Sequence, residues 1–289
     1  MSPSHAETLV LGAVAYDPKV VTIWEGFKAY FIRHGLPFDY ILFSNYERQV
    51  EALMAGYCDL AWNSPLAWIR AERMARAAGN QVQALAMRDT DCDLQSVIVV
   101  RADAPIKTVA DLKGKIIAVG AIDSPQASLL PLAHLRQAGL DPGKDFEVQQ
   151  HNVLAGKHGD HIGGERACAE ALMRGTADAA CLIRGNYDAF VHEGILTAER
   201  TRVLAETAPY DHCNFTVGPA APPELVERFR DLLLHMSYDD PEVRPLMELE
   251  GLTAWREGRV EGYRALESAV DQAGFYDRRG AIIEADYRY

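Results

Sequence analysis

Short runs of β-branched and aliphatic residues alternate with longer amphipathic segments along most of the chain. The run LVLGAVAY (9–16) predicts a strand, and VVTIWEGFKAYFIRHG (20–35) predicts an amphipathic helix that ends at a glycine. The same cycle continues with a strand at 38–43, a helix at 47–56 and a strand at 59–63. This rhythm predicts an α/β fold in which a largely parallel sheet is covered by helices.

A second block of the same kind follows a helix predicted at 64–79 and a strand at 82–87. Its elements are a strand at 96–103, a strand at 115–120, a helix after Ser124, a strand at 146–151, a helix at 165–175 and a strand at 177–183. Two more strands, RVLAE and NFTVG, precede a run of helices that reaches the end of the chain. Since no Pro- or Ser-rich linker separates the blocks, we predict two lobes joined by extended strands.

Composition narrows the class of partner. With 289 residues, the chain is long enough for two lobes of ordinary size. Its net charge of −12 argues against nucleic acid or an anionic membrane surface as a partner. The five cysteines are widely spaced and form no CxxC pair, which predicts reduced thiols, with Cys168 and Cys181 buried as small hydrophobic residues.

The N-terminal twenty residues contain no basic segment followed by a long apolar run. The sequence therefore predicts neither a secretory signal nor membrane insertion. We expect a cytoplasmic protein as the chain is written, or a periplasmic one if the chain is a processed form.

Three stretches resemble the phosphate/phosphonate branch of the periplasmic substrate-binding proteins of ABC transporters. They are SNYERQVEALMAGYCDLAW, SVIVVRADAPIKTVADLKGKIIAVG and LMRGTADAA. The resemblance implies a two-lobed fold with mixed sheets flanked by helices and two crossover strands as a hinge. It also implies a first lobe at 1–95 plus 206–289, a second lobe at 96–205, a small-molecule ligand in the cleft and an ABC permease as partner.

The ligand-binding motif differs from that of the family. Where phosphonate binders carry Ser-Thr-Ser-Gly-Tyr, this chain has Ser-Pro-Gln-Ala-Ser at 124–128. A His-Asp pair of the family is replaced by Gly164 and Glu165, and its paired tyrosines by Leu94 and Gln95. The resemblance therefore implies the fold but leaves the ligand open.

The most informative candidate contact is the predicted helix start after the strand at 115–120. Ser124 suits the N-cap and Pro125 the first helical position, so the N–H groups and positive dipole end would face the cleft. Ser124 and Gln126 are therefore candidate contacts to an anionic ligand. Simple helix capping explains the same residues without a ligand.

Other polar residues follow predicted strands and would face the same cleft. The resemblance places a ligand-contacting tyrosine at Tyr46, and Asn63 and Ser64 can donate hydrogen bonds, although capping and turn formation explain them equally well. Tyr16 ends the first strand. Arg184 follows the strand at 177–183, where a guanidinium favours a carboxylate or other oxyanion, or forms a surface salt bridge.

The segment GKHGDHIGGE (156–165) concentrates glycines, histidines and acids. Its glycines predict a loop that leads into a helix and allows close approach to a ligand. His158 and His161 are candidate ligand contacts. Together with Glu165, and with His212 and Cys213 near the return crossover, they are candidate ligands for a divalent metal. The spacing matches no established metal motif, so ligand contact, metal binding and simple turn polarity all remain open.

Three functions are compatible with these residues. The one we favour is a solute-binding protein that captures a small anion, phosphonate- or phosphate-like or a carboxylate, by hinge closure and requires no cofactor. The second is a cytoplasmic enzyme on the same fold with Cys213, His212 or Glu165 as a catalytic group. The third is a metal-binding or sensing protein. The lack of an export signal favours the last two, whereas the lack of GxSxG, P-loop and GxGxxG motifs favours the first.

Overall fold

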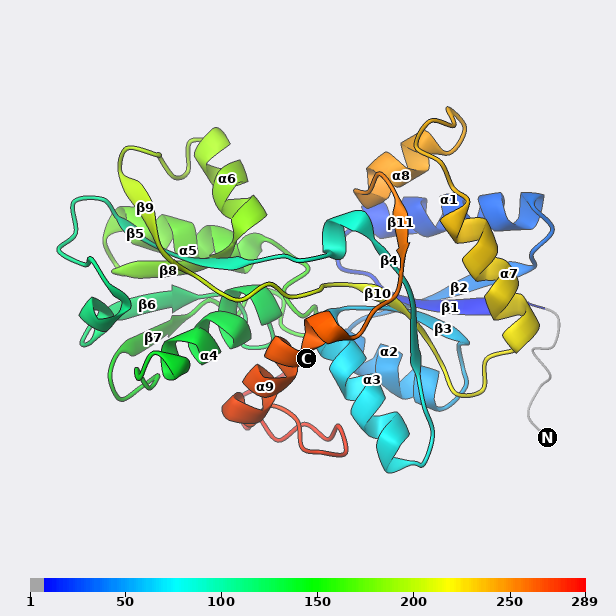
Figure 1. The fold of residues 1–289 in the computed structure, drawn as a ribbon, viewed down its shortest axis with the longest axis horizontal. Coiled ribbons are helices and arrows are strands. Elements are labelled where there is room, and N and C mark those ends of the chain that lie inside the picture. Colours follow the sequence, from blue (N-terminus) through cyan, green and yellow to red (C-terminus); the bar gives the residue numbers. More distant parts are fainter. Residues whose placement is uncertain (1–7) are drawn as a thin grey trace. The chain divides into compact units, whose positions relative to one another are not determined.

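The chain forms two α/β units in the computed structural model, which describes residues 8–289 (Figure 1). The described part of the first unit consists of residues 8–92, 211–263 and 276–282. The second unit consists of residues 93–210, 264–275 and 283–289. Residues 1–7, which begin the predicted first lobe and carry part of the expectation about an export signal, lie outside the described residues.

The first unit is built on a six-stranded mixed sheet with the order β11-β4-β10-β3-β1-β2. Its strands are β1 (Leu9–Val14), β2 (Phe38–Phe43), β3 (Leu60–Asn63), β4 (Gln83–Arg88), β10 (Asn214–Val217) and β11 (Trp255–Glu257). β1 runs parallel to β2 and β3, whereas β10 is antiparallel to both β3 and β4. The carboxyl ends of β1, β2 and β3 therefore meet at one edge of the sheet.

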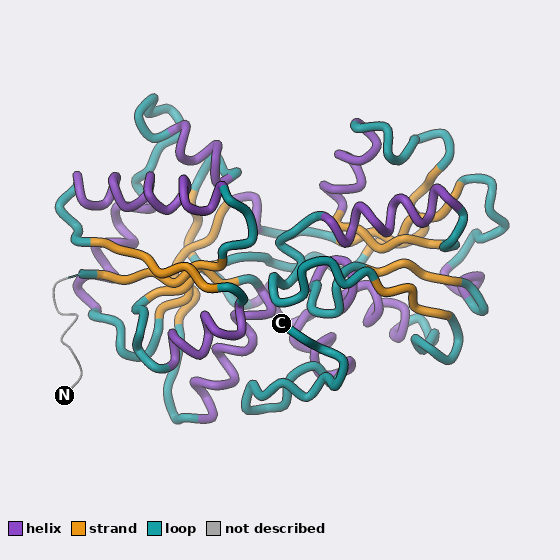
Figure 2. Tube along the Cα trace, turned by 180° about the vertical axis from the view of Figure 1, so that it is seen from behind, coloured by secondary structure: helices purple, strands orange, loops and turns teal. Residues whose placement is uncertain are grey.

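Helices cover both faces of this sheet (Figure 2). They are α1 (Lys19–Arg33), α2 (Tyr46–Met54), α3 (Pro65–Ala77), α7 (Pro223–Leu234) and α8 (Arg244–Glu250). On one face, Phe27 of α1 and Phe229 of α7 pack with Trp62, Phe215 and Trp255 of the sheet in an aromatic core. The opposite face packs against α2 and α3.

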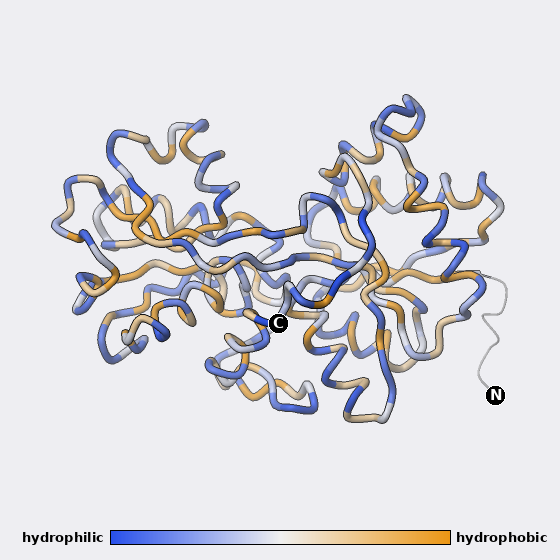
Figure 3. The backbone as a smooth tube through the Cα atoms, viewed as in Figure 1, coloured by the Kyte–Doolittle hydropathy of each residue, from blue (hydrophilic) through white to orange (hydrophobic). Residues whose placement is uncertain are grey.

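The second unit has a five-stranded mixed sheet with the order β7-β6-β8-β5-β9. Its strands are β5 (Ser96–Arg101), β6 (Ile116–Val119), β7 (Glu147–Gln150), β8 (Ala179–Ile183) and β9 (Thr201–Glu206). β6 runs parallel to β7 and β8, and β5 is antiparallel to β8 and β9. The central strands are hydrophobic along their length (Figure 3), as expected when both faces are buried.

The helices of the second unit are α4 (Leu130–Gln137), α5 (Gly163–Arg174), α6 (Arg184–His192) and α9 (Arg264–Ala273). The short helical turns η2 (Val109–Leu112) and η3 (Pro125–Leu129) also belong to the second unit, whereas η1 (Asp89–Asp91) and η4 (Glu261–Tyr263) belong to the first. Cys168 of α5 and Cys181 of β8 are fully buried, as predicted. The predicted α/β class with mixed sheets and flanking helices is confirmed.

The C-terminal segment differs from the expected arrangement. The first lobe was predicted at 1–95 plus 206–289, but 93–95, 206–210, 264–275 and 283–289 belong to the second unit. Residues 264–275 join the second unit because the apolar face of α9 buries Leu266, Ala269 and Val270 and packs on α4 and η3. The strands predicted from RVLAE and NFTVG exist as β9 and β10, but they lie in different sheets.

Between these two parts, residues 276–282 are held in the first unit by a buried ion pair. The Arg70 guanidinium lies 2.8 Å from the Glu47 carboxylate, and both side chains are almost completely buried. Tyr276 donates a hydrogen bond to Glu47 at 2.7 Å, and Arg70 Nε donates to the Gly280 carbonyl at 3.0 Å. The C-terminal segment therefore provides hydrogen bonds that replace part of the water lost when this ion pair is buried.

No helix in the described range 8–289 is long and apolar enough to cross a membrane.

The buried pair yields a stability prediction with an internal control. Arg70→Met leaves Glu47 buried without its cation, so we expect the free energy of unfolding to fall by about 3–5 kcal/mol. Arg48→Met removes an ion pair of the same 2.8 Å length, to Glu51, but the Arg48 side chain is 62% exposed. For that control we expect a loss of at most about 0.5 kcal/mol. Chemical denaturation measures both values, and equal losses would contradict this account.

Candidate functional site

In the first unit, two helices begin at the carboxyl ends of parallel strands. Asn45 caps α2 by accepting the Arg48 N–H at 2.9 Å. Ser64 caps α3 by accepting the Ala67 N–H at 3.1 Å, as predicted, with Pro65 in the first helical position. Ser64 is fully buried. Its capping role is therefore established by geometry, and its role as a ligand contact stays a prediction.

Asn63 belongs to a buried chain of hydrogen bonds in the same unit. Its Oδ1 accepts from Gln49 Nε2 at 2.8 Å, and its Nδ2 donates to Thr216 Oγ1 at 2.9 Å. Thr216 donates to Asn214, whose amide donates to the Tyr263 hydroxyl at 2.9 Å. Both ends of the Asn63 amide thus already have protein partners.

The other members of this chain of hydrogen bonds were not among the candidates predicted from the sequence. Asn214 and Thr216 are polar residues two apart in an otherwise apolar strand, which places both on one face of β10. That spacing was the available signal, because polar residues on a buried strand face must bond to one another.

The two tyrosines selected from the sequence differ in environment. Tyr46 is 1% exposed and packs with Val14, Val50, Ala67 and Ala71. Tyr16 is only partly buried and lies next to the Lys19 ammonium, which is 6.0 Å from the ring centre. Tyr16 is therefore the more accessible of the two for a ligand.

In the second unit, Ser124 organises the turn that follows β6. Its Oγ accepts the Ala127 N–H at 3.1 Å, and its carbonyl accepts from Ser128 at 3.1 Å and from Leu129 at 3.0 Å. The bond from Leu129 spans five residues, so the helix opens with the wide turn η3 before it continues as α4. Wide turns of this kind are frequent at functional sites. The predicted cap at Ser124 is confirmed.

The histidine-containing segment is a loop, as predicted, and α5 begins at Gly163. It folds onto the start of η3. The Asp123 carboxylate accepts the N–H groups of Gly156 at 2.5 Å and His158 at 3.2 Å, and Gln126 Nε2 donates to the Gly159 carbonyl at 2.6 Å. Gly159 has a φ of +76°, and a Cβ there would collide with Ser124 Oγ, so only glycine fits.

Asp123, a residue that the sequence analysis missed, is the anchor of this loop. Burial raises the pKa of its carboxyl, although the charge of His158 and the N–H groups of Gly156 and His158 oppose that shift. The same carboxylate oxygen accepts from the Tyr287 hydroxyl at 3.3 Å. The C-terminal segment and the loop therefore share one buried anchor.

The remaining candidates of the second unit are already engaged with the protein. His161 Nδ1 accepts the Gly163 N–H at 3.0 Å, and Glu165 accepts the Ile183 N–H at 2.8 Å. Arg184 forms an ion pair with Glu206. The surface salt bridge considered for Arg184 is thus present, and its role toward an anionic ligand stays a prediction.

His212 and Cys213 lie in the first unit, whereas His158, His161 and Glu165 lie in the second. Within residues 8–289, the one group of three possible metal ligands joins His212 and Cys213 to Asp91, with ligand atoms within 4.8 Å of one another. His212 Nδ1 is 3.1 Å from Cys213 Sγ and 3.6 Å from Asp91 Oδ1.

Arg88 limits the ability of this buried cluster to bind a metal. Its guanidinium bonds both oxygens of Asp91, at 2.6 and 2.9 Å. A cation bound there would compete with that guanidinium for the same carboxylate. For catalysis, His212 would need one ring nitrogen for the thiol and the other for the orienting acid, but the same Nδ1 faces both groups. The geometry therefore favours an ion pair that fixes the residues around η1.

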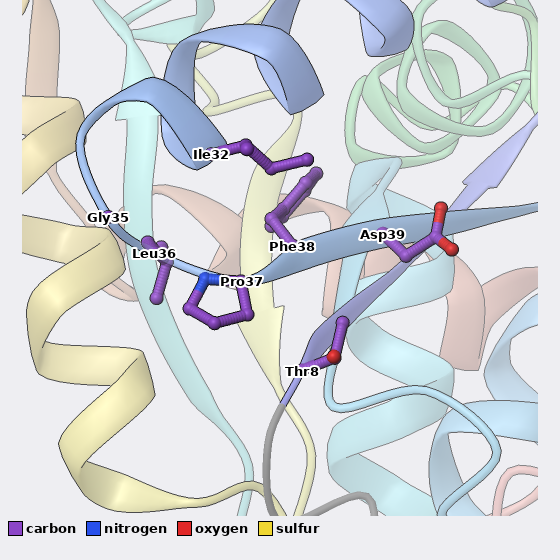
Figure 4. Close-up of a pocket in the computed structure, with 7 residues that line it drawn as sticks. All are labelled: Thr8, Ile32, Gly35, Leu36, Pro37, Phe38 and Asp39. Carbon is purple, nitrogen blue, oxygen red and sulfur yellow. The ribbon is translucent and has the colours of Figure 1, made fainter.

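An open pocket of about 440 Å³ lies elsewhere in the first unit, at the amino ends of β1 and β2 (Figure 4). It is lined by Thr8, Ile32, Gly35, Leu36, Pro37, Phe38 and Asp39. None of these is a candidate from the sequence, and the candidate residues follow the opposite ends of the strands.

Solved structures share this two-lobed fold. PhnD1 from Prochlorococcus marinus (MIT 9301), in complex with methylphosphonate, is 17% identical with a TM-score of 0.69, covering 93% of this chain and 98% of that one. XAC2383 from Xanthomonas citri, bound to ATP, is 18% identical with a TM-score of 0.72, covering 92% and 98%. The aliphatic sulphonate binding protein SsuA from Escherichia coli is 23% identical with a TM-score of 0.53, covering 92% and 83%.

These identities show the fold alone, that of the periplasmic binding proteins. The family is shown by a separate match over residues 13–263 to the family model described as "ABC transporter, phosphonate, periplasmic substrate-binding protein". The chain belongs to this family, and the resemblance noted in the sequence is confirmed.

The Asp91 cluster predicts how the free energy of unfolding changes at acid pH. Burial alone would raise the pKa of Asp91, but the charges and hydrogen bonds of Arg88 and His212 lower it from 3.8 to about 2. Because the folded-state pKa lies below the unfolded one, the stabilisation is complete above about pH 4 and is lost as the pH falls toward 2. We expect it to amount to about 2 kcal/mol.

Asp91→Asn should flatten the decline of the unfolding free energy between about pH 4 and pH 2 by that amount. Asp188→Asn, at an exposed position of α6, removes a charge of the same sign and controls for net charge. An acid profile of Asp91→Asn that runs parallel to the wild type would refute the assignment.

Proposed function

We propose that this chain is the substrate-binding component of an ABC importer and that it binds a small oxyanion at the start of the helix formed by η3 and α4. Family membership supports the first part. The second part rests on one observation, the turn after β6 at which Ser124 caps a helix directly behind a parallel strand. The start of such a helix presents N–H dipoles and the positive end of the helix dipole to an anion.

The ligands named for the similar structures agree with an oxyanion. Methylphosphonate, ATP and aliphatic sulphonates all contain a tetrahedral group with several oxygens. In this chain, the backbone N–H of Gln126 and the hydroxyl of Ser124 would receive that group, because the Ser124 N–H already donates to the Ala121 carbonyl. These donors are uncharged dipoles that act at short range. They can therefore bind an anion locally although the net charge of the protein is −12.

Proteins of this family are periplasmic components of ABC transporters, and this supports a proposal for the partner and the cellular location of the chain. The chain would act in the periplasm and deliver its ligand to an ABC permease, without a cofactor. A second function on the Asp91 cluster is not proposed, because Arg88 already occupies its carboxylate.

Binding and thermal denaturation test the proposal together. Methylphosphonate, inorganic phosphate and methanesulfonate are added separately, and we expect at least one to raise the melting temperature of the wild type. Ser124→Ala should weaken that binding about tenfold and lower the free energy of unfolding by about 1 kcal/mol, because the cap is lost.

Thr108→Ala is the matched control. Thr108 caps the short helix η2 in the same unit, ahead of β6. It should reduce stability to a similar degree while the affinity stays unchanged. If none of the three oxyanions shifts the melting temperature of the wild type, the proposed function is wrong.

A further inference from the structure

The last fifteen residues of the chain belong to both units in turn, and we call residues 275–289 the C-terminal strap. Phe275 is part of the second unit, residues 276–282 are part of the first, and residues 283–289 return to the second. Both changes of unit fall between neighbouring residues, whose Cα atoms are only about 3.8 Å apart. The match to the family model ends at residue 263, ahead of the strap.

The first part of the strap fits tightly against α3. Arg73 Nη1 donates to the carbonyls of Tyr276 at 3.1 Å and Asp277 at 3.2 Å. These bonds add to the contacts of Tyr276 with the buried ion pair described above. Gly280 has a φ of +78°, and a Cβ there would lie 2.9 Å from the Arg70 carbonyl oxygen. A larger residue at this position would therefore push the strap away from α3.

The second part of the strap is joined to the first by backbone bonds and ring packing. The Phe275 carbonyl accepts the N–H groups of Ile283 at 3.0 Å and Glu284 at 3.3 Å. The rings of Phe275 and Tyr287 pack with their centres 4.9 Å apart. Tyr287 is 3% exposed, and its hydroxyl donates to Asp123 Oδ2 at 3.3 Å. Contacts thus run along the strap as far as Asp123.

Asp123 connects the strap to the glycine-rich loop of the second unit. The oxygen that accepts from Tyr287 also accepts the N–H groups of Gly156 and His158. All three donors share this one buried oxygen, so a movement of Tyr287 changes the bonding that holds the loop.

We infer that the strap is a conformational device that docks and releases as one cooperative segment. It couples the buried Arg70–Glu47 pair of the first unit to the loop held by Asp123 in the second. The physical basis is a single segment with a docked and a released state, whose equilibrium both ends influence. The inference is independent of the ligand and of the proposed function.

Gly280→Ala tests the coupling from the first unit. Hydrogen exchange of the full chain is measured by mass spectrometry without ligand. Because the added methyl group collides with the Arg70 carbonyl, we expect amides at 276–282 to exchange about tenfold faster. Amides at 283–284 and 156–158 should accelerate by a similar factor, although they belong to the other unit.

Gly251→Ala is the matched control. Gly251 lies in the first unit with a φ of +80°, and within the described chain a Cβ there would meet no atom inside 4 Å. The variant therefore has the same kind of backbone strain without a collision. Exchange at 276–282 and at 156–158 should stay at the wild-type rate.

Tyr287→Phe interrupts the link while keeping the ring. The loss of the hydroxyl should itself accelerate exchange at 156–158 and, because the strap docks as one segment, speed exchange at 276–282 about fivefold. In the double variant, Gly280→Ala should still accelerate exchange at 276–282 about tenfold. It should add nothing at 156–158, because the connection to Asp123 is gone.

Every result decides the inference. If Gly280→Ala accelerates exchange at 276–282 but leaves 283–284 and 156–158 at the wild-type rate, the strap is not cooperative and the inference is overturned. It is also overturned if exchange at 276–282 is no faster than in Gly251→Ala. Should Gly280→Ala fail to fold, Tyr287→Phe decides alone, and unchanged exchange at 276–282 in that variant would contradict the coupling.

Discussion

Polar groups at the carboxyl ends of buried parallel strands must find partners, and this constraint shapes both units. Each of these strands ends beside a helix start, where N–H groups have no partner within the helix. In the first unit, Ser64 and Asn45 cap the helices, and a chain of hydrogen bonds runs through the interior from Gln49 through Asn63 to Tyr263.

The second unit meets the same constraint through a capped turn and an anchored loop. Ser124 accepts most of the N–H groups of its turn, and Asp123 anchors the glycine-rich loop. The backbone N–H of Gln126 is not among the groups that Ser124 accepts, and the buried oxygens Asp123 Oδ1 and Gln126 Oε1 have no hydrogen-bond donor within the described residues. An anion that accepts from the Gln126 N–H would leave the hydrogen bonds to Ser124 in place.

Local sequence signals predicted much of this arrangement. Alternating hydrophobic runs located the strands, and the Ser-Pro pairs at 64–65 and 124–125 located two helix starts with their caps. The glycines around His158 correctly indicated a loop, because positive φ angles there favour glycine.

Features that depend on distant contacts were not predictable in the same way. The role of Asn63 depends on Thr216, more than a hundred residues away, and α9 joins the second unit because its apolar face fits α4. Asp91 and Asp123 were missed because an acidic residue in a turn is usually exposed, whereas here buried partners hold both carboxylates.

The most direct measurement is a crystal structure of the chain with methylphosphonate bound. The account predicts a phosphonate oxygen about 3 Å from the backbone nitrogen of Gln126, at the start of the helix behind β6. A phosphonate ordered elsewhere, with no contact to the turn at 124–128, would contradict it.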